Sequence, residues 1–151
     1  MKNEIFMAEA ITEAKKALPF GDVPVGAVIV KDGEIIGRGY NMREKNNSAT
    51  AHAEVIAIEN ACKTLGSPRL DGAQMFVTLE PCPMCAGAIA QSRLDKVVFG
   101  AYDEKAGAVG SVFNLYYDFK FPHIPKFCGG VMEAECAALL DGFFENLRRN
   151  K

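Results

Sequence analysis

The sequence predicts an α/β fold built on one mixed sheet, and three observations support this prediction. The segment Val25 to Tyr40 has the pattern of a hairpin, later apolar runs are separated by helical patterns, and 151 residues are the usual size of one domain. Hairpin strands pair antiparallel, whereas strands separated by a helix favour parallel pairing through a crossover. We therefore expect one domain over residues 1–151 with both kinds of pairing.

The first part of the chain predicts a helix followed by a hairpin. Apolar residues recur at helical spacing from Glu4 to Leu18, where Pro19 ends the pattern. The continuous apolar run Val25 to Val30 predicts a strand buried on both faces. Asp32-Gly33 is a two-residue turn signal, and Glu34 to Tyr40 predicts the returning strand.

The middle of the chain predicts alternating helices and strands. A second helix ends at Gly66 and is expected to present one apolar face, formed by Val55, Ile58, Cys62 and Leu65. A strand at Met75 to Leu79, a short helix from about Pro83 to Gln91 and a strand at Lys96 to Phe99 follow. This alternation predicts parallel pairing of the two later strands.

The pattern weakens between Gly100 and Gly130, where only Ser111 to Tyr117 indicates a helical turn. A loop this long in a compact domain is usually functional, so we expect substrate contacts there. A final helix is predicted by apolar residues at helical spacing, namely Cys136, Leu139, Leu140, Phe143 and Leu147. It ends at Arg148 and Arg149, where positive charge is favourable.

Composition excludes several classes of protein. Charged residues are distributed through Met1 to Phe20, and no segment has transmembrane length, so we expect a cytoplasmic protein with no membrane association. The five cysteines are an odd number, which favours metal or thiol chemistry over a disulfide framework. A net charge of -2 gives no general attraction for nucleic acid, although a local basic patch remains compatible with it.

Two short motifs carry the chemistry that we predict. The first is Thr50-Ala51-His52-Ala53-Glu54, and the second is Glu80-Pro81-Cys82-Pro83-Met84-Cys85; each opens a predicted helix. Two thiolates and one imidazole are good zinc ligands, and three protein ligands leave the fourth tetrahedral position for water. We therefore expect His52, Cys82 and Cys85 to bind zinc.

Glu54 is the predicted catalytic residue. It lies two residues after His52, so its carboxylate can reach a water molecule at the metal while the imidazole is a ligand. In hydrolytic deamination Glu54 would take a proton from that water. It would then deliver protons to the ring nitrogen and to the departing ammonia.

The paired His-x-Glu and Pro-Cys-x-x-Cys motifs resemble the zinc nucleobase deaminases. The resemblance extends along the chain to the bacterial tRNA-specific adenosine deaminases of the cytidine/deoxycytidylate deaminase superfamily. The matching segments, in order, are Val23 to Val28, Gly39-Tyr40-Asn41, Thr50 to Glu54, Val77 to Gly87, Ser92-Arg93, Val97 to Ala101, Gly107 to Ser111 and Glu135 to Leu140.

This resemblance implies a three-layer α/β/α cytidine-deaminase-like fold, with a central mixed sheet of about five strands and helices on both faces. It also implies one zinc ion per subunit, a homodimer, and conversion of the wobble adenosine to inosine in a tRNA anticodon. Asn41 and Ala53 match positions that border the purine. Five further residues lie in segments that match those with which the related enzymes bind the anticodon loop: Asp103, Lys105, His123, Phe144 and Arg148.

The chain departs from the family pattern at two places. Phe121-Pro122-His123-Ile124 stands where related enzymes commonly have Asn-His-Arg, which removes two polar flanks from that loop. Ser48-Ala49 replaces a frequent Asp-Pro ahead of the first motif. The aromatic stretch that contains Phe113, Tyr116, Tyr117, Phe119 and Phe121 is compatible with base stacking or with ordinary packing.

Two alternatives remain open on the sequence alone. The motifs do not separate an RNA substrate from a free base or nucleoside, such as guanine, cytosine or cytidine. A closed structural zinc site completed by Cys128 or Cys136 would make the chain a non-catalytic module, although it would leave Glu54 without a role.

Overall fold

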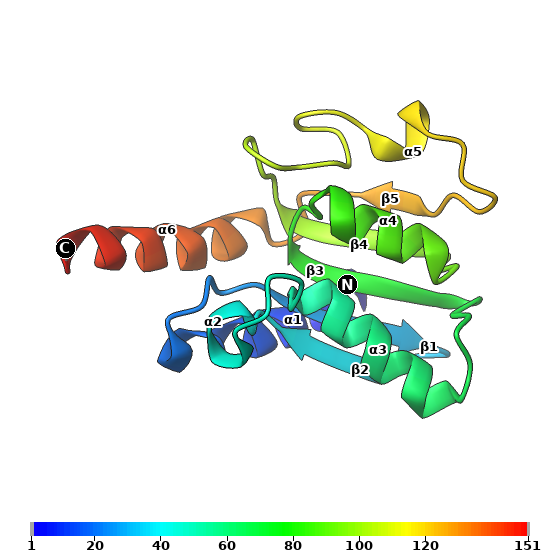
Figure 1. The fold of residues 1–151 in the computed structure, drawn as a ribbon, viewed down its shortest axis with the longest axis horizontal. Helices are drawn as coiled ribbons and strands as arrows, with labels where there is room; N and C mark the ends of the chain where they lie inside the picture. The colour runs from blue at the N-terminus through cyan, green and yellow to red at the C-terminus, as the bar shows by residue number, and fades with distance from the viewer. Residues whose placement is uncertain (1, 151) are drawn as a thin grey trace.

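The computed structural model describes residues 2–150, which form a five-stranded sheet with the order β2-β1-β3-β4-β5 (Figure 1). The strands are β1 (Gly26–Lys31), β2 (Glu34–Tyr40), β3 (Ala73–Leu79), β4 (Lys96–Ala101) and β5 (Lys126–Cys128). β1 pairs antiparallel with both β2 and β3, whereas β3 with β4 and β4 with β5 are parallel. The predicted mixed sheet is confirmed.

Helices cover both faces of this sheet, as predicted (Figure 1). They are α1 (Lys2–Lys15), the short 3-10 helix η1 (Leu18–Phe20), α2 (Arg43–Asn46), α3 (Ala53–Leu65), α4 (Pro83–Gln91), α5 (Leu115–Asp118) and α6 (Glu133–Arg149). α1 packs on the face that carries Phe76, where Phe6 contacts its ring, and Cys136 of α6 packs behind Gly100 on the same face. α3 and α4 lie together on the opposite face, and apolar side chains from β1, β3 and β4 fill both interfaces.

The predicted hairpin is confirmed, together with its turn. Lys31 pairs with Glu34, and Asp32 and Gly33 between them have φ values of 52° and 79°. Positive φ at both central positions is the geometry that matches the twist of two antiparallel strands, and an Asp-Gly pair adopts it readily.

α3 approaches the sheet through a face that differs from the predicted one. Its fully buried residues are alanines, whereas Val55, Ile58, Cys62 and Leu65 are only partly buried; the alanines are Ala53, Ala57 and Ala61. The alanines pack against Gly37 and Gly39 of β2, where an added side chain would collide with the α3 backbone. Because the contacting residues are alanines on α3 and glycines on β2, the axis of α3 lies close to the sheet.

Several predicted boundaries are wrong by a few residues, and one strand was not predicted. The first helix ends at Lys15 instead of Leu18, because Pro19 lies inside the separate η1 turn. The helical turn expected at Ser111 to Tyr117 is α5. β5 is a three-residue edge strand after a long loop, too short to show a period in the sequence.

Within residues 2–150, no helix is both long enough and apolar enough to cross a membrane.

The close approach of α3 predicts a difference between two glycine substitutions. Gly39→Ala places a methyl group against the Ala53 carbonyl, so we expect a loss of about 1–3 kcal/mol in the free energy of unfolding. Gly142→Ala is the matched control, since position 142 in α6 has open space and alanine favours a helix. Thermal unfolding should show a lower Tm for the first variant and an equal or higher Tm for the second. An unchanged Tm for Gly39→Ala would contradict the packing argument.

Candidate metal centre and active site

His52, Cys82 and Cys85 meet at one point, although they come from two separate segments. One potential ligand atom from each lies within 4.8 Å of the other two. The His52 Nδ1 atom is 3.6 Å from the Cys82 Sγ atom and 3.5 Å from the Cys85 Sγ atom. A tetrahedral zinc ion with bonds of about 2.3 Å to sulfur and about 2.0 Å to nitrogen separates those atoms by about 3.5 Å. The donor set and its spacing fit zinc.

The first residues of two helices position these side chains. His52 is the N-cap of α3, and Cys82 is the N-cap of α4, with Pro83 in the first turn. Neither side chain forms the usual N-capping hydrogen bond, and both are directed at the cluster. The positive ends of the helix dipoles favour thiolate over thiol.

The electrostatics of the cluster already favour a negative sulfur. Hydrogen bonds from the Cys85 thiol and from His52 lower the pKa of Cys82 to about 4. The Cys82 sulfur in turn raises the pKa of His52 and, together with burial, raises the pKa of Cys85. The site thus holds a thiolate at neutral pH that is suited to a soft divalent cation.

Glu54 lies beside this cluster and is 4% exposed. Burial raises the pKa of its carboxyl group to about 7, with a smaller contribution from the negative Cys82 sulfur. A carboxyl group with a pKa near the working pH can both accept and release a proton efficiently. This is the property that the sequence prediction requires of Glu54.

The cluster opens into a cavity of about 190 Å³. Cys85 is fully buried behind this cavity. The polar residues that line it are Asn41, Arg43, His52, Glu54, Glu80, Cys82 and Asp103. Asn41 is almost buried, and its backbone N-H donates to the Val25 carbonyl. The structure therefore brings two of the predicted substrate-binding residues to the predicted catalytic group.

Two further hollows continue from this cavity toward α6. The first shares Val23, Leu79, Asp103 and Ala106 with the cavity and adds Lys105 and Phe144. The second contains Lys105 and Phe144 again, together with Arg148. Four of the predicted RNA-contacting residues thus lie along one path that begins at Glu54.

Two predicted substrate-binding residues lie outside this path. Ala53 is fully buried at the start of α3 and does not line the cavity. His123 binds the Leu94 carbonyl through its Nε2 atom at 2.8 Å, in a hollow with Lys96 and Lys126. Lys96 and Lys126 begin β4 and β5, whereas the cavity lies at the carboxyl ends of β3 and β4, so His123 is at the opposite end of the sheet.

The aromatic stretch mainly packs against itself and against β5. Tyr116 is buried and contacts Phe121 and Phe127, while Phe119 contacts Phe121. The hydroxyl group of Tyr116 donates to the Ala86 carbonyl of α4. These contacts support a packing role for Tyr116 and Phe121, whereas Phe113, Tyr117 and Phe119 remain exposed.

Among the polar and aromatic residues of the site, Arg43, Glu80 and Tyr102 were not predicted as substrate contacts. Arg43 lies two residues after Asn41, and the sequence offered it, with Lys45, only as a candidate basic patch against the commoner case of scattered surface cations. Tyr102 lines the hollow beside Phe144 and stacks edge-on against Phe99. Its position directly after a strand end was the available signal.

The alternative of a closed four-ligand site finds no support among residues 2–150. Cys82 and Cys85 are joined there by His52 alone, and neither Cys128 nor Cys136 belongs to the cluster. Cys136 instead packs behind Gly100 on the α1 side of the sheet. An open coordination position is the arrangement of catalytic zinc sites.

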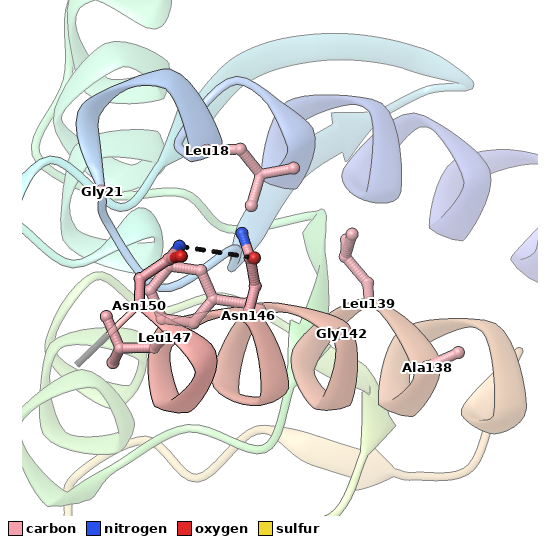
Figure 2. Close-up of a pocket in the computed structure, with 9 residues that line it drawn as sticks. Leu18, Gly21, Ala138, Leu139, Gly142, Asn146, Leu147 and Asn150 are labelled. Carbon is pink, nitrogen blue, oxygen red and sulfur yellow. Dashed lines mark hydrogen bonds between the residues drawn. The ribbon is translucent and has the colours of Figure 1, made fainter.

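A separate apolar groove lies between η1 and α6, and Figure 2 shows Leu18 pointing toward the helix that carries Leu139 and Leu147. Asn150 donates to Asn146 at one end of this groove. The groove shares no lining residue with the cavity that contains Glu54.

Comparison with known proteins agrees with this geometry. Residues 1–101 match the family model of the cytidine and deoxycytidylate deaminase zinc-binding region. The tRNA-specific adenosine deaminase of Bacillus subtilis is 52% identical over 150 residues, which cover 99% of this chain and 93% of that protein. The tRNA-specific adenosine deaminase of Aquifex aeolicus is 46% identical over 150 residues, covering 99% of both chains.

Two solved structures are also similar. A tRNA:A34 deaminase studied for A-to-I editing at the wobble position of transfer RNA has a TM-score of 0.84 and 42% identity, covering 90% of this chain and 99% of that chain. This similarity confirms the predicted cytidine-deaminase-like fold. A guanine deaminase from Bacillus subtilis has a TM-score of 0.63 and 47% identity, covering 66% of this chain and 64% of that chain.

The ligand geometry predicts that Cys85→Ser loses stoichiometric zinc, because a serine hydroxyl remains protonated and is a poor ligand for zinc. Elemental analysis of the purified protein measures the metal content, and circular dichroism checks that the variant is folded. Cys62→Ser is the control, since Cys62 is a partly buried cysteine outside the cluster and should leave zinc content unchanged. Full zinc occupancy in Cys85→Ser would show that the ligand set is wrong.

Proposed function

This chain belongs to the cytidine and deoxycytidylate deaminase family and, within it, to the tRNA-specific adenosine deaminases, and on that premise we propose that it hydrolytically converts the wobble adenosine of a tRNA anticodon to inosine. The observation that carries the proposal is the meeting of His52, Cys82 and Cys85 beside a buried Glu54 at the base of a cavity.

His52, Cys82 and Cys85 hold one zinc ion per subunit in this proposal. Their soft donor atoms have the spacing of three corners of a zinc tetrahedron. A zinc ion bound there acts as a Lewis acid and makes water a nucleophile near neutral pH.

Glu54 moves the protons of the reaction. With a pKa of about 7, its carboxylate accepts a proton from the attacking water. The protonated carboxyl group donates that proton to the ring nitrogen of the adenine. The carboxylate then accepts the remaining proton of the added hydroxyl group and delivers it to the exocyclic amino group, which leaves as ammonia while the new C=O bond forms. One buried group serves in both steps because its two protonation states have similar free energy near neutral pH.

The cavity supplies the groups that orient the base. The Asn41 amide can both donate and accept hydrogen bonds, which suits the edge of a purine. A cavity of this size admits one base, so the target nucleotide must leave the anticodon stack to reach Glu54.

The path from the cavity to α6 accommodates the remainder of the anticodon loop. Lys105 and Arg148 supply positive charge for phosphates, and Phe144 presents an exposed ring on which an unpaired base can stack. Asp103 joins the cavity to this path. The same hollows also contain the carboxylates of Glu104, Asp141 and Glu145, so the two cations act as individual phosphate contacts and not as a positively charged patch.

We also propose that the chain is one deaminase domain, acts as a homodimer and works in the cytoplasm, where tRNA is the substrate. The sheet receives helices from both ends of the described chain, which supports a single domain. Exposed apolar side chains such as Tyr117 and Phe119 are available for an interface between subunits.

A free base is the alternative substrate, and the similarity to a guanine deaminase is the observation that favours it. That similarity covers about two-thirds of each chain, whereas the similarity to the tRNA-specific enzymes covers 93% or more of each chain in the two relatives above. The RNA substrate is therefore the better supported of the two.

The first test incubates the zinc-loaded protein with an anticodon stem-loop carrying adenosine at the wobble position and detects inosine by mass analysis. We expect inosine from the wild type and at least a 10²-fold lower kcat from Glu54→Ala with zinc content unchanged. Glu59→Ala, an exposed glutamate of the same helix, is the control and should retain activity. Turnover of free guanine or cytosine without turnover of the stem-loop would contradict the RNA substrate, and near-normal kcat in Glu54→Ala would contradict its role.

The path along α6 makes a second prediction. Lys105→Ala and Arg148→Ala should each raise KM for the stem-loop and reduce the salt dependence of binding by about one counterion, with kcat nearly unchanged. Lys63→Ala, an exposed cation of α3, should change neither quantity. His123→Ala tests the prediction that His123 contacts RNA. An increase in KM would show that the hollow around His123 is part of the RNA-binding surface, and an unchanged KM would show that it is not.

A further inference from the structure

Glu80 is a buried carboxylate that the proposed reaction does not use. It is 2% exposed and lies between the end of β3 and Pro81-Cys82. Among the described residues, no lysine, arginine or histidine forms an ion pair with it. A carboxylate buried without a cation requires other compensation, because burial of an isolated charge is strongly unfavourable.

The compensation comes from one loop, which surrounds the carboxylate. The Oε1 atom accepts hydrogen bonds from the Asp103 N-H at 3.1 Å and from the Ser111 hydroxyl group. The Oε2 atom accepts from the N-H groups of Val109 at 3.0 Å and Ser111 at 3.1 Å. An ionised carboxylate has about four acceptor positions, so these four donors satisfy it fully.

The backbone of this loop packs directly against the Glu80 carboxylate. A side chain at Gly107 would collide with the Glu80 carboxyl carbon, so only glycine fits beside it. The Ala108 N-H donates to the Pro81 carbonyl at 2.9 Å, and the Asp103 carboxylate accepts from the N-H of Lys105. The segment 103–111 is therefore connected to the metal-binding segment through Glu80 and its neighbour.

The same loop is one wall of the substrate path. Asp103 and Ala106 line the cavity that contains Glu54, as does Glu80 itself, and Lys105 lines both hollows that lead to Arg148. Displacement of this loop would widen the cavity and separate Lys105 from α6. None of the zinc ligands belongs to the loop itself.

We propose that Glu80 is a positioning residue for substrate binding, which fixes the loop 103–111 as the wall of the RNA path by holding three of its backbone N-H groups and the Ser111 hydroxyl group. This inference rests on the proposed function for the identity of the substrate. It assigns Glu80 an effect on KM that is exerted through the loop, with no contact to the reacting atoms.

Glu80→Gln tests the connection to the loop without any substrate. The amide keeps the shape of the side chain, but its NH2 group cannot accept the N-H bonds that one carboxylate oxygen receives. Hydrogen exchange of the Asp103, Val109 and Ser111 amides should accelerate at least about tenfold in one or more of these positions, a factor that corresponds to about 1.4 kcal/mol. Glu13→Gln is the matched control, because Glu13 is an equally buried carboxylate that pairs with Lys16 and Arg38, away from the loop.

Kinetics on the stem-loop test the consequence for function. In Glu80→Gln we expect KM to rise about tenfold, kcat to stay within about threefold of wild type and zinc content to remain stoichiometric. Ser111→Ala removes one donor and leaves the carboxylate in place, so it should change exchange and KM in the same direction by less. This variant also provides the test if Glu80→Gln does not fold.

Unchanged loop exchange would overturn the proposal. Loss of zinc and of kcat at unchanged KM would also overturn it, since Glu80 would then support only the segment that carries Cys82. A wild-type protein that makes no inosine would contradict the proposed function alone, and the exchange measurement would still decide the role of Glu80.

Discussion

The close packing of α3 on β2 is the contact on which the candidate site depends. His52 and Cys82 are 30 residues apart in sequence and lie at the starts of two different helices, so their ligand atoms meet only if both helix starts converge at one edge of the sheet. α4 follows β3 directly and has little freedom. α3 arrives from a separate loop, and its position is fixed by alanines lying against Gly37 and Gly39. The glycines of β2 therefore determine where the imidazole lies, although they take no part in the chemistry.

Two buried carboxylates beside the cavity show how environment separates roles within one site. Burial raises the pKa of Glu54 to about 7, which suits proton transfer. Glu80 is at least as buried, yet four donors surround its two oxygens. Saturated hydrogen bonding suits a side chain that holds a loop in place, whereas a carboxyl group with a pKa near neutrality suits proton transfer. The two proposed roles therefore follow from different surroundings of the same residue type.

The sequence predicted those features that depend on local pattern. The hairpin turn at Asp32-Gly33, the helix that starts at Pro83 and the proximity of His52 to the cysteine pair all follow from short-range spacing and from helix-start chemistry. Features that depend on tertiary packing were missed. The buried face of α3 is formed by small residues that carry a weak hydrophobic signal, and Glu80 resembles a solvated loop glutamate until the fold places segment 103–111 around it. His123 was assigned by alignment of a motif, and only the sheet topology shows that it lies at the opposite end.

In the sequence, the residues of the reaction centre precede the residues that we propose to bind the rest of the substrate. The family model covers residues 1–101, which contain the zinc ligands, Glu54 and Asn41. Asp103, Lys105, Phe144 and Arg148 all follow that region, on a loop and a helix that extend the cavity. A reaction centre of this kind can therefore remain constant while the later segments change which molecule reaches it. Similarity confined to about two-thirds of the chain, as with the guanine deaminase, is compatible with a different substrate. The relatives that are 46–52% identical over almost the whole chain, α6 included, are tRNA-specific adenosine deaminases, and this is the stronger argument for an RNA substrate.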